Sequence, residues 1–237
     1  MWKSILIVAA FCVIRPFALV AAQDDSENDS SAALPKDYAD KYLLAQNTLS
    51  PDKTIGVIYP KLDLCEDESD KRCQDFLVQL KPFKILGTLD TESPHFQNKS
   101  HGGISGEWSK DGVAALVTLE SKWGPGDIFL YEFKDGTLTR STNLLRKIHD
   151  LLEPDFRKAM SARYNDSFDF IFESEDKPMV EFKDSTVQIN ATATTDPKEI
   201  PGEKAWDGKV EAVWDITQAK FTSQKVRRLF AGVRKGE

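Results

Sequence analysis

The run from Trp108 to Gly136 is the part of the chain that most constrains the fold. It reads WSKDGVAALVTLESKWGPGDIFLYEFKDG, in which turn-forming segments separate two apolar runs. Asp-Gly pairs favour tight turns, because glycine accepts a positive φ and aspartate hydrogen-bonds the backbone two residues on. Residues 113–119 are apolar on both faces, which is typical of a strand buried on two sides. We therefore expect an antiparallel meander at the centre of the sheet.

The same stretch resembles a blade of the β-propeller family that includes TolB and the N-terminal domains of prolyl oligopeptidases. In such a blade a W-S-P-D-G turn precedes one strand, and an aromatic-rich strand that ends in an Asp-Gly turn follows. Trp108, Ser109, Asp111 and Gly112 match this turn, whereas Lys110 stands in the proline position. The resemblance is confined to this one run. It implies a propeller with a central channel and implies no catalytic residue.

A second turn of this kind, Ser50-Pro51-Asp52-Lys53, also precedes an apolar run. Ser50 and Ser109 lie 59 residues apart, whereas propeller blades recur about every 40–50 residues. The spacing therefore does not favour a regular array. An irregular or incomplete β-propeller-like fold remains the alternative.

The periodicity changes after residue 140. Apolar side chains recur at helical spacing in STNLLRKIHDLL (141–152), and Pro154 is expected to end this helix and to open a second one. We therefore predict a helical pair over about 142–163. Runs typical of strands and hairpins surround it at 43–60, 76–90, 167–174, 179–182, 185–194, 210–216 and 220–230. The predicted fold class is α+β, with mostly antiparallel β meanders and hairpins.

The N-terminus is typical of an exported protein. Lys3 precedes a short apolar run, and small residues up to Ala22 lead into a polar segment, so residues 1–22 are interpreted as a signal peptide. Arg15 and Pro16 interrupt the apolar run, which is too short to span a membrane. Residues 23–37 are acidic and serine-rich, and we expect a disordered linker there. Residues 38–237 would then form a single globular α+β domain in an extracytoplasmic location, periplasmic or secreted.

Cysteine usage agrees with export. Cys12 lies in the expected signal peptide, which leaves Cys65 and Cys73 as a pair. An oxidising compartment favours a disulfide between two cysteines that flank one short acidic loop. We predict that disulfide.

The charge distribution limits the partners. A formal net charge of -7 is unlike the basic footprint of nucleic-acid-binding proteins, so no nucleic-acid partner is expected. A basic patch stands out near the C-terminus, formed by Arg227, Arg228, Arg234 and Lys235. This patch could bind an anionic partner. The alternative is a solvated chain end.

Three side chains are candidate ligand-binding residues: His95, His101 and Trp123. His95 and His101 share the 90–107 loop with acidic residues, and such a set could ligate zinc or copper. The helical H-E-x-x-H spacing is absent, so we predict no metal and no cofactor. Trp123 lies between turn residues and could anchor a sugar or a peptide, although it could also pack on its own turn. His149, on the helix, is expected to be structural.

No complete catalytic constellation is recognisable in the sequence. Ser105 lies in Gly-Ile-Ser-Gly and lacks the surroundings of a nucleophile elbow. The leading hypothesis is therefore a non-catalytic binding or interaction protein for a protein, peptide or glycan partner. The alternative is an exported hydrolase or metalloenzyme that uses the 90–107 loop. A structural component of the cell envelope is the third interpretation.

Overall fold

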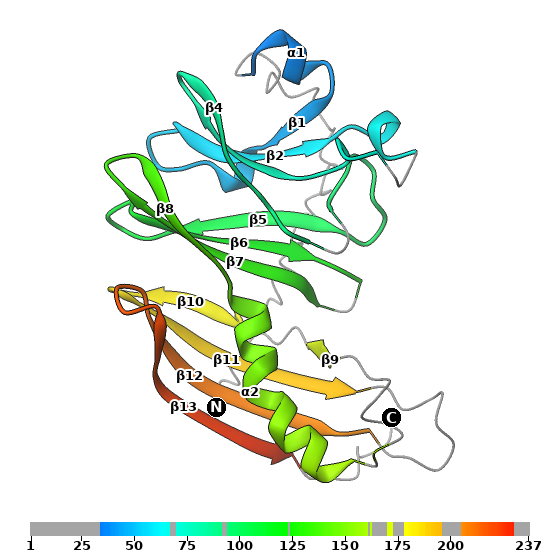
Figure 1. The fold of residues 1–237 in the computed structure, drawn as a ribbon, viewed down its shortest axis with the longest axis vertical. Helices are drawn as coiled ribbons and strands as arrows, with labels where there is room; N and C mark the ends of the chain where they lie inside the picture. The colour runs from blue at the N-terminus through cyan, green and yellow to red at the C-terminus, as the bar shows by residue number, and fades with distance from the viewer. Residues whose placement is uncertain are drawn as a thin grey trace, which may run out of the picture.

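The computed structural model describes residues 34–66, 70–91, 94–122, 124–160, 162, 170–172, 178–195 and 205–229. Within these residues the fold is mostly antiparallel β-sheet, with strands β1–β13 arranged in three sheets. Figure 1 shows the three sheets stacked along the long axis of the molecule, with one long helix in front of the third. The expected signal peptide lies outside the described residues, as do most of the expected linker and Trp123, Arg234 and Lys235.

The first sheet is a four-stranded meander in the order β1-β2-β3-β4. Its strands are β1 (Tyr42–Ala45), β2 (Ile55–Pro60), β3 (Phe76–Leu80) and β4 (Phe83–Thr88). The hairpin expected at 43–60 is present, with the 3-10 turn η2 (Gln46–Thr48) in its connection. The short helix α1 (Lys36–Ala39) precedes this sheet, and Leu34 is already buried, so ordered packing begins before Tyr38.

The connection between β2 and β3 contains the 3-10 turn η3 (Leu62–Cys65) and the predicted disulfide. Cys65 and Cys73 are bonded, with their Cα atoms 5.1 Å apart. The pairing predicted from the cysteine count is thus present in the structure.

The second sheet is the predicted central meander, in the order β5-β6-β7-β8. It consists of β5 (Gly103–Trp108), β6 (Ala114–Glu120), β7 (Pro125–Lys134) and β8 (Thr137–Asn143). Alternate residues of β6 and β7 point into different cores. Leu116 and Leu130 pack toward the third sheet, whereas Val117 and Tyr131 pack toward the first. The expectation of a strand buried on two sides is confirmed for β6.

The two Ser-x-Asp turns adopt the same conformation. In one, Ser50 Oγ donates to Asp52 Oδ1 at 2.6 Å and accepts from the backbone N–H of Ile55 at 2.9 Å. In the other, Ser109 Oγ donates to Asp111 Oδ1 at 2.7 Å and accepts from the N–H of Ala114 at 2.9 Å. Each turn leads into the second strand of its meander, so the first two sheets are built on one pattern.

The first two sheets are joined where η2 meets β5. Trp108 donates its indole N–H to the carbonyl of Thr48 at 2.9 Å, and Asn47 Nδ2 donates to the carbonyl of Ile104 at 2.6 Å. A Cβ on Gly106 would lie 2.8 Å from the Cα of Thr48. Only glycine therefore fits at position 106 without moving the backbone.

The predicted helical pair is wrong for the described residues, because α2 (Leu144–Ala159) runs through Pro154 as one helix. A proline inside a helix costs about 3 kcal/mol relative to alanine. Leu152 and Phe156 flank it on one face and are fully buried. Their burial contributes about 1.5–3 kcal/mol each, which offsets the proline. A prediction that considers only the helix-breaking tendency of proline does not include this packing.

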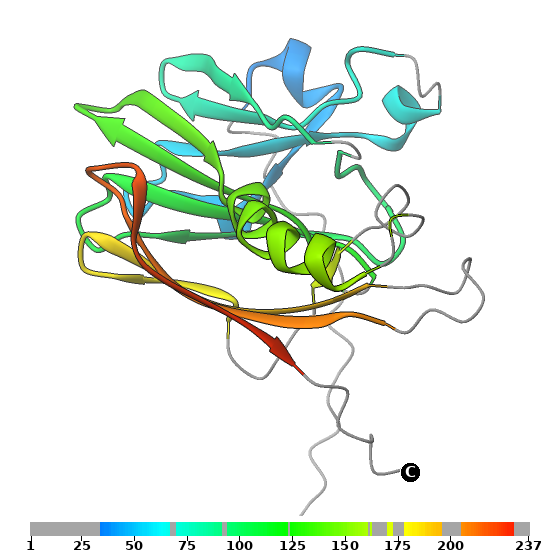
Figure 2. The ribbon, with the colours of Figure 1, turned by 60° about the horizontal axis from the view of Figure 1, so that its bottom comes forward.

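The third sheet has the order β10-β11-β12-β13, and β9 also pairs with β11. Its strands are β9 (Phe170–Phe172), β10 (Val180–Lys183), β11 (Thr186–Thr195), β12 (Asp207–Asp215) and β13 (Lys220–Leu229). Figure 2 shows this sheet curving around α2. The helix packs on the sheet in one core with Trp206 and Trp214. Among the described residues, no helix combines the length and apolarity required to cross a bilayer.

Candidate functional site

A pocket of about 800 Å³ opens where the second sheet meets α2 and β9. This volume lies within the range of small-molecule sites, about 300–1,000 Å³. The walls come from the loop before β5, the β6–β7 turn, the first half of α2 and β9. The histidines of the chain all line it: His95, His101 and His149. Segments far apart in the sequence thus form one site.

The loop wall is held from beneath by a buried carboxylate. Asp75, which is fully buried, accepts a hydrogen bond from the backbone N–H of His95 at 2.7 Å. Among the described residues its second oxygen, Oδ1, has no hydrogen-bond partner. Burial raises the pKa of Asp75 to about 7, and Lys99 opposes this shift by favouring the charged form. The side chain of His95 packs T-shaped on Tyr59, with ring centroids 4.7 Å apart.

The helical wall begins at Asn143, the N-cap of α2. Its side-chain oxygen accepts from the N–H of Arg146 at 2.9 Å, which is the usual role of an N-cap. Its Nδ2 donates to Asp127 Oδ1, at the start of β7, at 2.8 Å. Asn143, Arg146 and Asp127 all line the pocket. One side chain therefore fixes the first turn of α2 against the second sheet.

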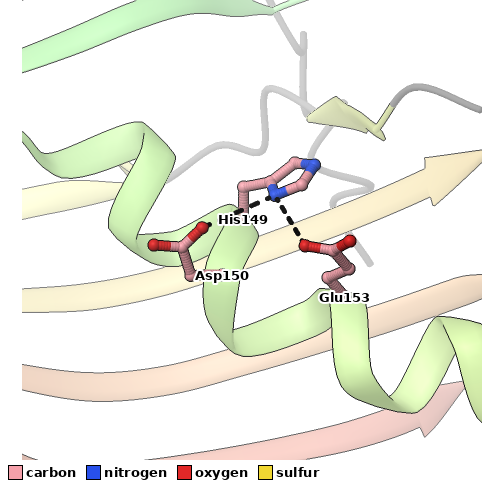
Figure 3. A group of neighbouring side chains, drawn as sticks. All are labelled: His149, Asp150 and Glu153. Carbon is pink, nitrogen blue, oxygen red and sulfur yellow. Dashed lines mark ion pairs between the residues drawn. The ribbon is translucent and has the colours of Figure 1, made fainter.

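Further along α2, three polar side chains face one another on the pocket wall (Figure 3). His149 Nδ1 lies 3.9 Å from Glu153 Oε2 and 4.0 Å from Asp150 Oδ1. One ligand atom from each residue lies within 4.8 Å of the others. These atoms are a nitrogen and two carboxylate oxygens, the types that bind divalent transition metals.

Burial changes the acid–base properties of the pocket walls. It lowers the pKa of His95, and the positive charge of Lys99 adds to that effect. It also lowers the pKa of Lys99, which Asp75 partly offsets. The pKa of Glu120, at the end of β6, is raised for the same reason. His95 is therefore held toward its neutral form, which can accept as well as donate a hydrogen bond.

The candidate residues from the sequence divide into three groups. His95 and His101 meet in the pocket, as does His149, for which we expected a structural role. Ser105 lies within β5 and does not line the pocket. Trp123 lies outside the described residues, although its chain neighbours Lys122 and Gly124 line the pocket. The spacing of His149 and Glu153 was the one signal that could have located the helical wall, because residues four apart share a helix face.

The described part of the basic patch lies elsewhere, on β13. Arg227 forms an ion pair with Glu211 of β12, and Arg228 is exposed on the same strand. Neither residue lines the pocket. The described part of the basic patch and the pocket are therefore separate features.

Comparison of the chain with models of known protein families, with curated proteins and with solved structures finds no match.

Proposed function

We propose that this chain is an exported, non-catalytic binding protein that takes a small polar ligand, such as a sugar or a short peptide, into the pocket beside α2. The observation that carries this proposal is the convergence of His95, His101 and His149 on one pocket of ligand size. Signal-peptide cleavage after Ala22 and an extracytoplasmic location are part of the proposal. The disulfide between Cys65 and Cys73 supports them.

The lining of the pocket suits a ligand that is both polar and partly apolar. Leu119, Leu145, Phe170 and Phe172 are buried apolar side chains in its walls. Carboxylates, imidazoles and the Asn143 amide add donors and acceptors around them. Most of the lining side chains are polar or charged, so a ligand that forms several hydrogen bonds fits this pocket better than an apolar one.

Saturation-transfer NMR of the purified protein against a panel of mono- and oligosaccharides, amino acids and short peptides tests the proposal. We expect saturable binding of at least one class, weakened about fivefold by His101→Ala, since one lost hydrogen bond is worth about 1 kcal/mol. Lys225→Ala is the matched control, because Lys225 is exposed on β13 and outside the pocket. Absence of saturable binding across the panel at millimolar concentrations would contradict the proposal.

An exported hydrolase or metalloenzyme that uses the 90–107 loop is the second candidate, favoured by the presence of His95 and His101 in one pocket. Because Ser105 is not in that pocket, such an enzyme would have to activate a water molecule rather than this serine. Turnover in a broad hydrolase screen, lost on His101→Ala, would favour this candidate over a pure binding protein.

We also propose that the first two sheets are two propeller-type blades in an irregular α+β fold. Both are four-stranded meanders, and the same Ser-x-Asp turn precedes the second strand of each. If so, α2 and the third sheet cover the face on which a third blade would stack. Transplanting residues 109–113 onto positions 50–54 should then preserve folding, and loss of the folded state would count against a shared blade pattern.

A further inference from the structure

We propose that His149, Asp150 and Glu153 bind a divalent transition-metal ion on the α2 wall of the pocket, with zinc the best fit. The inference rests on the proposed function in placing binding at this pocket, and it assigns an inorganic ligand to one wall of it. None of the side chains that the sequence suggested for ligand binding belongs to this group.

The ligand atoms of the three residues lie farther apart than they would around a bound zinc ion. In tetrahedral coordination with bonds of about 2.1 Å, two ligand atoms of one zinc ion lie about 3.4 Å apart. The 3.9 Å and 4.0 Å separations from His149 Nδ1 exceed this by roughly half an ångström. All three ligand atoms lie within 4.8 Å of one another, so the side chains have to rotate on the helix to bring every pair to the separation of a zinc site. Figure 3 shows the two carboxylates approaching the same nitrogen from different sides.

The oxygens that do not face His149 are bound by cations. Glu153 Oε1 accepts from Arg157 Nε at 2.7 Å, with Nη2 at 2.6 Å, which leaves Oε2 directed at the imidazole. Asp150 Oδ2 lies 3.9 Å from Lys147 Nζ, while Oδ1 faces His149. Partners of this kind orient ligating carboxylates in metal sites, and they are typical of a second coordination layer.

The imidazole is also held in place by packing. The ring of His149 packs T-shaped on Phe170 at 4.8 Å between centroids, and Phe170 is buried in the core beneath. Separations of 3.9 Å and 4.0 Å are longer than a hydrogen bond. The three ligand atoms therefore lie around one gap, and a cation in that gap would be attracted to both carboxylates.

The mixture of ligand atoms decides the class of ion. One imidazole nitrogen and two carboxylate oxygens suit zinc and its transition-metal neighbours, whereas magnesium and calcium prefer oxygen alone. Three protein ligands leave a fourth zinc position open. Because His149, Asp150 and Glu153 all line the pocket, that position is available to water or to a ligand bound there.

Isothermal titration of the purified, chelator-treated chain with zinc chloride at pH 7.4, without a histidine tag, tests the inference. We expect saturable uptake of one zinc ion per chain and loss of that uptake in His149→Ala. Glu153→Gln and Arg157→Gln should each lower the affinity about tenfold or more, the latter because it frees the ligating carboxylate. Glu181→Gln, an exposed acid on β10, is the matched control and should bind as the wild type does.

Cobalt provides a second readout, since a visible absorption band should appear with the wild type and disappear with His149→Ala in variants that retain the wild-type circular dichroism spectrum. No saturable zinc uptake up to about 1 mM, the weak end of specific affinities, would overturn the inference. Equal affinities of the wild type and His149→Ala would do the same. Repeating the saturation-transfer panel with EDTA separates the two proposals, because ligand binding that persists without metal sustains the proposed function alone.

Discussion

Trp108 donates its indole N–H to the backbone carbonyl of Thr48, 2.9 Å away, and so joins the first sheet to the second. The ring also stacks on Phe133, with centroids 5.3 Å apart. Trp108→Phe keeps an aromatic ring and removes the donor. We expect a loss of about 1–2 kcal/mol in the free energy of unfolding, measured by urea denaturation. Val113→Ala, at a position 47% exposed, should change it by less than about 0.5 kcal/mol; equal effects would show that the contact does not join the sheets.

Pro154 provides a test of the single helix. If α2 is continuous through residue 154, Pro154→Ala restores the missing backbone donor and should stabilise the protein by about 1–3 kcal/mol. Two separate helices with Pro154 at the start of the second would instead make this substitution neutral or unfavourable. The midpoint of thermal unfolding measures the difference, and an unchanged or lowered midpoint would contradict the continuous helix.

The Ser-x-Asp turns show what could be predicted from the sequence, and helix α2 shows what could not. The turn at Ser109 depends on contacts within five residues, so local chemistry is sufficient to place it and the strands that follow. Whether the helix continues through Pro154 depends on the burial of Leu152 and Phe156 against a sheet whose strands come later in the sequence. That gain is not visible in a local pattern, and the helix was therefore predicted as two.

The pocket follows the same division. His95 and His101 were recognisable as candidates because they share one loop, but His149 joins them only through the packing of α2 beside the second sheet. Its distance along the chain gave no indication of that contact. Asp75 was not a candidate at all, since a lone aspartate before a strand carries no sequence signal for burial.

Asp75 should make stability depend on pH in a direction opposite to that of most carboxylates. Its pKa of about 7 in the folded protein exceeds the unfolded value near 4, so the folded state binds the proton more tightly. The contribution of Asp75 to the free energy of unfolding is fully present below about pH 4 and is lost as the pH rises through 7. The slope reaches about 1.4 kcal/mol per pH unit at most. Urea unfolding of the wild type and Asp75→Asn between pH 4.5 and 8 isolates this slope.

The control for that comparison is Asp135→Asn, an exposed turn residue at positive φ, a conformation that asparagine tolerates. We expect its stability to follow the wild type at every pH. If Asp75→Asn also follows the wild type, the carboxyl of Asp75 does not hold a proton at neutral pH.

The disulfide should stabilise the first sheet without affecting the pocket. Cys65 and Cys73 are eight positions apart, and replacing both with serine opens the loop that the disulfide closes. We expect the free energy of unfolding to fall by about 2–3 kcal/mol. Neither cysteine lines the pocket, so the affinity for zinc should be unchanged. Parallel urea unfolding and zinc titration check both halves. A fall in zinc affinity equal to that of Arg157→Gln would contradict the separation of the two regions.

Asn143 has a consequence for how a ligand could be found. Because its side chain caps α2 and binds Asp127 in the pocket wall, a molecule that engages this wall reinforces the first turn of a helix anchored in the main core. Occupancy and global unfolding are then thermodynamically linked. A ligand at a hundred times its Kd adds about 2.7 kcal/mol, a rise of roughly 5–11 °C in Tm for a chain of this size. The melting curve of the protein can therefore serve as an assay for compounds whose chemistry is not known in advance.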